Sequence, residues 1–227
     1  PGSKILYIIR RQDDWCESVY NQVIKNGFSI SPNKFFSFYH NKFYLSDDNY
    51  LPFVNISQLD YLKKINFYEK EFGNKNILVL PFESIKDNRI TFYKKISNFI
   101  DVKINNETKI KKTNSNESIN IYTYYILRIL NKFILNDYNS FGFIPNQPFL
   151  DYLKKINNNN FTIRVLYFIL KRISLLYLLQ ISINKISKKK YVFFNDERKK
   201  IIFKIHRHSN RELSKKYNLD LDKYHYF

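Results

Sequence analysis

The stretch that most constrains the fold lies near the start of the chain, where an apolar run ends in two cations and passes directly into a helix. Residues 4–9 contain a short, continuous apolar run of β-branched and aromatic side chains, which predicts a buried β-strand. Arg10 and Arg11 follow, and either of the next two aspartates, Asp13 and Asp14, can cap a helix that runs to about residue 25. A strand that feeds straight into a helix is typical of a parallel sheet with crossover helices.

The same alternation continues over the first hundred residues. Pro32 favours the start of a second helix that includes His40, and Ser57 favours the start of a third, which Gly73 stops. A second strand follows at residues 77–80, and a helix spans about 90–100. The pattern predicts the α/β class, with a parallel sheet flanked by helices.

The second half of the chain has a different character. Residues 103–117 are polar and basic without periodicity, which predicts a loop. The remainder is predicted to be mostly helical, at about 118–135, 147–156, 162–186 and 195–217. With 227 residues we expect a single domain, 1–227, with an α/β part at 1–117 and a mainly helical part at 118–227.

The chain is strongly basic, with 38 Lys and Arg against 20 Asp and Glu and a net charge of +18. Such a surplus favours anionic partners, although a lysine-rich surface can also reflect A+T-rich codons, which the abundant Ile, Asn, Phe and Tyr indicate. No apolar stretch reaches the roughly 18 uncharged residues of a membrane span, so we expect a cytoplasmic protein. The apolar helix with basic interruptions at 162–186 leaves peripheral membrane contact open.

A candidate anion site follows from the opening stretch. Ligands of open parallel sheets bind beyond the carboxyl ends of the strands, which is where Arg10 is expected. The next helix offers its positive N-terminal end, and the Ser18 hydroxyl can face the same crevice. These groups together suit a phosphate. The alternative is that Arg10 pairs with Asp13 or Asp14 at the surface.

The stretch KILYIIRRQDDWCESVYNQ resembles the 3′-phosphate-binding segment of sulfotransferases that use 3′-phosphoadenosine 5′-phosphosulfate (PAPS), and its RQDDW wording is similar to bacterial members. In that family a serine on the helix follows the strand-end arginine by eight positions, as Ser18 follows Arg10. The resemblance implies that these two side chains hold the 3′-phosphate. It also implies a sulfotransferase fold, with a P-loop-NTPase-like parallel sheet flanked by helices and a mostly helical C-terminal half.

Further segments carry the same resemblance, in the family's order. YLKKINFYEKEFGNKNILVLPFESIKDN is similar to the next helix–strand unit, with Glu83 expected to anchor neighbouring backbone. SNFIDV resembles a helix ending in which Asp101 replaces the usual glycine. The loop KKTNSNES implies a second contact to the 3′-phosphate, through Lys112 and Asn114. The ending SNRELSKKYNLDLDKYHYF resembles the closing helix and tail, whereas residues 136–195 match poorly.

One part of the family pattern has no counterpart. The strand and loop that grip the 5′-phosphosulfate would lie upstream of Lys4, and no G-x-x-x-x-G-K-[ST] sequence occurs in the chain. We therefore expect the C-terminal part of a sulfotransferase or a truncated relative, with activity absent or very low unless that segment is restored. The catalytic lysine and general base are not assigned to residues.

The resemblance implies an enzyme that moves a sulfuryl group from PAPS to a hydroxyl or amine acceptor, with a glycan or lipid-linked glycan as the expected acceptor. No metal is required by this chemistry, and the four histidines lack the cysteine and carboxylate neighbours of a metal site. The expected partners are therefore the nucleotide and the acceptor, and not nucleic acid. The alternative function is a non-catalytic, basic nucleic-acid-binding module, in which aromatic side chains between lysines stack on bases.

Overall fold

The computed structural model describes residues 3–44, 53–102, 119–135, 144–145 and 189–227. It is a mixed α/β structure in which helices predominate and a small parallel sheet of two strands is flanked by helices. The chain divides into two compact units. Unit 1 comprises Pro1–Cys16, Phe36–Ser115 and Phe194–Phe227, and unit 2 comprises Glu17–Phe35 and Asn116–Phe193.

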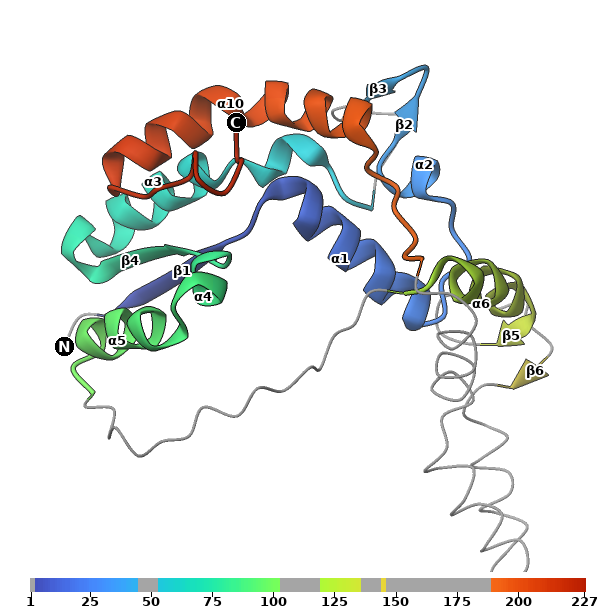
Figure 1. The fold of residues 1–227 in the computed structure, drawn as a ribbon, viewed down its shortest axis with the longest axis horizontal. Coiled ribbons are helices and arrows are strands. Elements are labelled where there is room, and N and C mark those ends of the chain that lie inside the picture. The colour runs from blue at the N-terminus through green and yellow to red at the C-terminus, as the bar shows by residue number, and fades with distance from the viewer. Residues whose placement is uncertain (1–2, 45–52, 103–118, 136–143, 146–188) are drawn as a thin grey trace, which may run out of the picture. The chain divides into compact units, whose positions relative to one another are not determined.

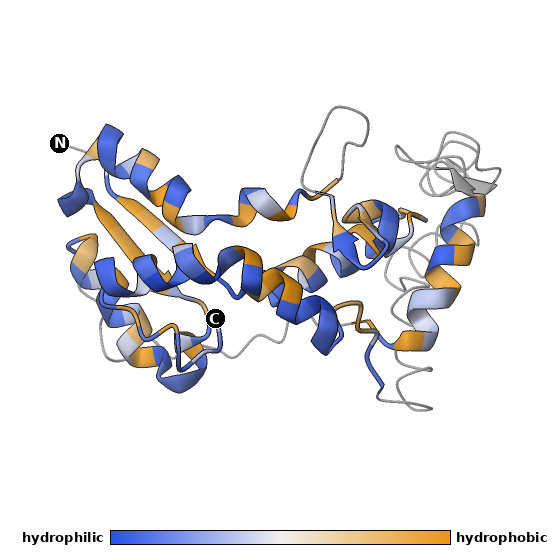
Figure 2. Ribbon diagram, turned by 90° about the horizontal axis from the view of Figure 1, so that it is seen from above, coloured by the Kyte–Doolittle hydropathy of each residue, from blue (hydrophilic) through white to orange (hydrophobic). Residues whose placement is uncertain are grey.

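The parallel sheet of unit 1 confirms the predicted strands. β1 (Ile5–Ile9) pairs with β4 (Ile77–Pro81), Ile5 opposite Ile77 and Ile9 opposite Pro81. The amide of Phe82 donates to the Ile9 carbonyl at 2.7 Å, which extends the pairing by one residue. Figure 2 shows both strands in the orange of hydrophobic residues, as the short apolar runs require.

Unit 1 also contains helices, 3-10 helices and a short hairpin. Helix α3 (Tyr61–Phe72) lies beside the long C-terminal helix α10 (Asp196–Lys216) (Figure 1). The elements are the hairpin β2 (Phe38–Tyr39) and β3 (Lys42–Phe43), the 3-10 helices η1 (Ile56–Leu59) and η2 (Asn74–Asn76), and the helices α3 (Tyr61–Phe72), α4 (Ser84–Asp87), α5 (Arg89–Phe99) and α10 (Asp196–Lys216). The first residues of α1 (Gln12–Lys25) also belong to unit 1.

The helix starts show where sequence prediction worked and where it did not. Asn195 caps α10 by accepting from the Arg198 amide, close to the predicted start. Ser57 does not cap the third helix, so that prediction was wrong. The chain first makes η1, and Asp60 then caps α3 by accepting from the Lys63 amide at 3.1 Å.

His40 lies in the turn of the β2–β3 hairpin, with a backbone φ of 49°, and the predicted second helix is wrong beyond Phe35. The four-residue helix α2 (Pro32–Phe35) does begin at the predicted proline. The chain turns back because Phe38 and Phe43 bury their rings against each other, with centroids 4.7 Å apart.

Unit 2 contains most of α1, α2, α6 (Ile121–Phe133) and the short parallel pair β5 (Ile134–Leu135) and β6 (Ile144–Pro145). Its core holds Tyr20 and Tyr124, whose hydroxyl oxygens lie 3.1 Å apart. Asn131 donates to the carbonyls of Ile24 and Phe28 at 2.9 and 2.8 Å, so α6 satisfies backbone groups at the end of α1. The helices predicted at 147–156 and 162–186 lie outside the described residues.

The core of unit 1 joins segments from both ends of the chain. Ile9, Ile65 and Leu213 are fully buried in one cluster that also includes Leu221 and Tyr226 from the C-terminal tail. Burial of these side chains is the main source of stability for the sheet and its covering helices. Within the described ranges, no helix is long and apolar enough to span a bilayer.

His206 fixes α10 against η1, and its environment generates a pH prediction. Its Nε2 lies 3.0 Å from the Ile56 carbonyl oxygen, so the neutral ring donates a hydrogen bond from its Nε2–H to that oxygen. Burial lowers the pKa of His206, and the unfolded chain therefore binds a proton that the folded chain does not. The free energy of unfolding is then highest above the ordinary histidine pKa of about 6.5 and falls as the pH drops below it.

We expect His206→Gln to flatten this dependence, since glutamine can donate to Ile56 without titrating. Between the ordinary histidine pKa and the lower pKa of folded His206, the wild type should lose up to about 1.4 kcal/mol of unfolding free energy per pH unit more than the variant. Urea unfolding followed by circular dichroism at several pH values measures this. His208→Gln, an exposed neighbour on α10, is the control. Equal flattening in both variants would contradict the assignment.

Candidate anion-binding site at the end of strand β1

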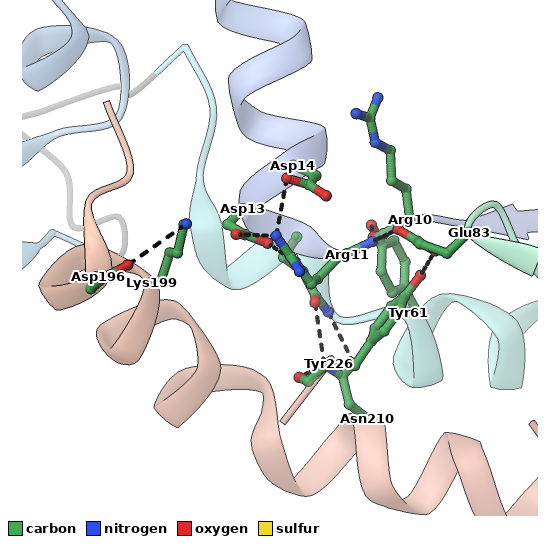
Figure 3. A network of polar contacts seen from close by, with 11 residues as sticks. Arg10, Arg11, Asp13, Asp14, Tyr61, Glu83, Asp196, Lys199, Asn210 and Tyr226 are labelled. Carbon is green, nitrogen blue, oxygen red and sulfur yellow. Dashed lines mark hydrogen bonds and ion pairs between the residues drawn. The ribbon is translucent and has the colours of Figure 1, made fainter. Parts of the chain in front are cut away.

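The peptide group between Arg10 and Arg11 is held from both sides. Its carbonyl, that of Arg10, accepts a hydrogen bond from the Tyr61 hydroxyl at 2.6 Å. Its N–H, that of Arg11, donates to Glu83 Oε1 at 3.0 Å (Figure 3). Burial raises the pKa of Tyr61, which keeps the hydroxyl protonated and able to donate. The point where β1 passes into α1 is therefore fixed in orientation.

Glu83 also binds the C-terminal tail. Its second oxygen, Oε2, accepts from the Tyr226 hydroxyl at 2.7 Å, and Tyr226 is fully buried. Burial, together with the neighbouring Glu83 charge, raises the pKa of Tyr226, so this hydroxyl remains a donor. The prediction that Glu83 anchors neighbouring backbone is confirmed by its bond to Arg11.

The Arg11 side chain neutralises the acidic start of α1. Its guanidinium binds both oxygens of Asp13, at 2.7 and 3.0 Å, and one oxygen of Asp14 at 3.1 Å (Figure 3). Asp13 is only 1% exposed, so its charge needs such a partner. The expected alternative, an ion pair of Arg10 with these aspartates, is wrong because Arg11 takes that position.

Arg10 is consequently the arginine of this junction that is not paired with Asp13 or Asp14. Its guanidinium carbon lies over the Phe82 ring, 5.4 Å from the centroid, and the side chain points away from Glu83 and Tyr61 (Figure 3). Among the described residues it makes no ion pair or side-chain hydrogen bond. A half-buried arginine at the carboxyl end of a parallel strand, stiffened by an aromatic ring, suits an oxyanion such as phosphate.

A buried amide pair ties this junction to α10. Gln12 Nε2 donates to Asn210 Oδ1 at 2.9 Å, and Asn210 Nδ2 donates to Gln12 Oε1 at 3.2 Å and to the Tyr226 carbonyl at 2.9 Å. Both amide side chains are at most 1% exposed. Sequence reasoning missed Gln12, Asn210 and Tyr226, because the pairing joins residues 198 positions apart and nothing local marks it.

The other three predicted contacts to the 3′-phosphate, from Ser18, Lys112 and Asn114, stay predictions. Ser18 is exposed in the second turn of α1 and belongs to unit 2, whereas Arg10 belongs to unit 1. Lys112 and Asn114 lie outside the described residues. The described part of the chain contains no group of three or more His, Cys, Asp or Glu side chains that could hold a metal ion.

Comparisons with known proteins add no assignment to this geometry. No protein-family model matches the chain, and no significant match is found among curated proteins or among solved structures.

The role of Tyr226 can be tested by removing one oxygen atom. Tyr226→Phe leaves Glu83 Oε2 without its donor in a partly buried setting, so the free energy of unfolding should fall by about 1.5–3 kcal/mol, the range for hydrogen bonds to charged groups. Chemical denaturation measures the change. Tyr122→Phe, at a tyrosine that is 53% exposed, is the control and should change little. Equal losses in both variants would contradict the anchoring role.

Proposed function

We propose that Arg10 binds the 3′-phosphate of an adenosine nucleotide and that the chain belongs to a PAPS-dependent sulfotransferase. The observation that carries the proposal is that two adjacent arginines differ in their ion pairing. Arg11 binds Asp13 and Asp14, whereas Arg10, at the carboxyl end of β1, forms no ion pair with any residue that the structure describes. The likeness of the surrounding sequence to the family's 3′-phosphate segment supports the choice of ligand.

The finer fold assignment belongs to the same proposal. β1 and β4 pair in parallel. In this proposal they are two neighbouring strands of the larger parallel sheet of a P-loop-NTPase-like sulfotransferase fold. Ser18, Lys112 and Asn114 supply further contacts to the 3′-phosphate in this proposal. The resemblance, rather than the contacts at Arg10, supports those three residues.

The proposed reaction is an in-line transfer of the sulfuryl group. The acceptor oxygen or nitrogen forms a bond to sulfur while the bond from sulfur to the 5′-phosphate oxygen breaks. Adenosine 3′,5′-bisphosphate leaves with that electron pair, and a base takes the acceptor proton. Arg10 contributes by holding the nucleotide in register, away from the bonds that change. The proposed acceptor is a hydroxyl or amine of a glycan, and the chemistry needs no metal.

Calorimetric titration tests the nucleotide site. We expect adenosine 3′,5′-bisphosphate to bind more tightly than adenosine 5′-monophosphate, and Arg10→Ala to remove at least about tenfold of that preference, the value of one charge-assisted contact. The variant should keep its fold, because the bonds of Tyr61 and Glu83 go to backbone atoms around Arg10.

Arg89→Ala on α5 removes the same charge from unit 1 and is the matched control. The proposal fails if the two nucleotides bind equally well, if neither binds, or if Arg10→Ala and Arg89→Ala behave alike. Sulfuryl transfer from radiolabelled PAPS to a panel of glycans, by a chain to which the upstream strand and loop have been restored, then tests the reaction separately from binding.

A further inference from the structure

The outer face of α10 carries a row of cations. The residues follow one another at intervals of three or four positions, about one helical turn each, and occupy about a quarter of the helix circumference. All five are exposed. The cationic row consists of Lys200, Lys204, Arg207, Arg211 and Lys215.

The opposite face of α10 is built into unit 1. Ile202, His206, Asn210 and Leu213 are buried, and α10 lies against α3 and η1. The cationic row therefore points away from the core of its unit. Because the apolar face is already covered, α10 cannot insert that face into a lipid surface without unfolding.

The row differs from the neighbouring cations of the same helix in its pairing. Lys199 contacts Asp196 at 3.8 Å (Figure 3), and Lys216 pairs with Glu69. In the described part of the chain, by contrast, no member of the cationic row forms an ion pair. Arg211 is steadied over the Phe227 ring, 5.3 Å from its centroid.

Helix stability does not account for such a row. Cations stabilise a helix dipole only within the last turn, which explains Lys215 and leaves the four earlier members without that benefit. Like charges one turn apart instead destabilise a helix by a few tenths of a kcal/mol per pair. An anionic polymer that follows the row would remove this repulsion.

We propose that the cationic row binds the phosphate backbone of a nucleic-acid duplex without reading its sequence. Proteins that hold single strands add aromatic side chains on which bases stack, and the one Phe, Tyr or Trp of α10 is the half-buried Phe203. A duplex keeps its bases stacked inside and presents phosphates alone, which lysine and arginine contact without base readout. This proposal stands on α10 and does not depend on sulfuryl transfer.

Salt dependence gives a sharp test with the full chain. Fluorescence anisotropy with a short labelled DNA duplex, between about 50 and 200 mM salt, yields the slope of log K against log salt. Five phosphate contacts predict a slope near −4.5, at about −0.9 per contact. Lys204→Gln with Arg207→Gln should bring the slope about 1.8 closer to zero and weaken binding at every salt concentration.

The matched control is Lys94→Gln with Lys95→Gln, which removes the same charge from exposed positions on α5 and should leave the slope unchanged. Circular dichroism checks that all variants keep their helices. Equal effects of the two double variants would overturn the proposal, because net charge alone would then explain binding. Tighter row-dependent binding of single strands, heparin or anionic vesicles than of duplex at the same salt would also overturn it.

Discussion

In unit 1, the way in which β1 passes into α1 depends on the hydrogen bonding of one peptide group, the one between Arg10 and Arg11. At this point β1 has stopped pairing with β4 and α1 has not begun, so neither element can satisfy the carbonyl of Arg10 or the amide of Arg11. Unpaired backbone groups in a partly buried position cost free energy. Tyr61 and Glu83 supply the missing partners, and Tyr226 holds Glu83 in turn. The start of α3, the end of β4 and the C-terminal tail therefore meet at this junction.

This arrangement separates the roles of two chemically identical neighbours. Two hydrogen bonds to the buried Asp13 offset the free energy that Arg11 loses on desolvation. Arg11 would have to break these bonds in order to bind a ligand. The Arg10 guanidinium lies over an aromatic ring, while its backbone carbonyl is held by the Tyr61 hydroxyl. A fixed backbone with an uncommitted cation is the property expected of a pre-organised anion site, because little ordering remains to be done on binding.

Sequence reasoning succeeded where the signal was local. The apolar runs gave both paired strands, and α5 and α10 were predicted to within about a residue at each end, because their caps and periodicity are short-range features. It failed where two local solutions competed, as at Ser57 and Asp60, and where aromatic packing turned the chain at His40. The position of Arg10 directly after β1 and the anchoring of backbone by Glu83 were predictable from the sequence. Asn210 and Tyr226 were not, because their partners lie far away in the sequence and depend on tertiary packing.

In helix α10, one element of a chain with a net charge of +18 carries both buried core side chains and exposed cations. Its inner face contributes Leu213 to the core and Asn210 to the junction at Arg10, and both side chains are almost completely buried. Its outer face contributes only charge. The helical period keeps the two faces apart, so the free energy of folding comes from one face and is opposed by repulsion along the other. A stable inner face permits the outer face to carry a row of cations that forms no ion pair with the described residues.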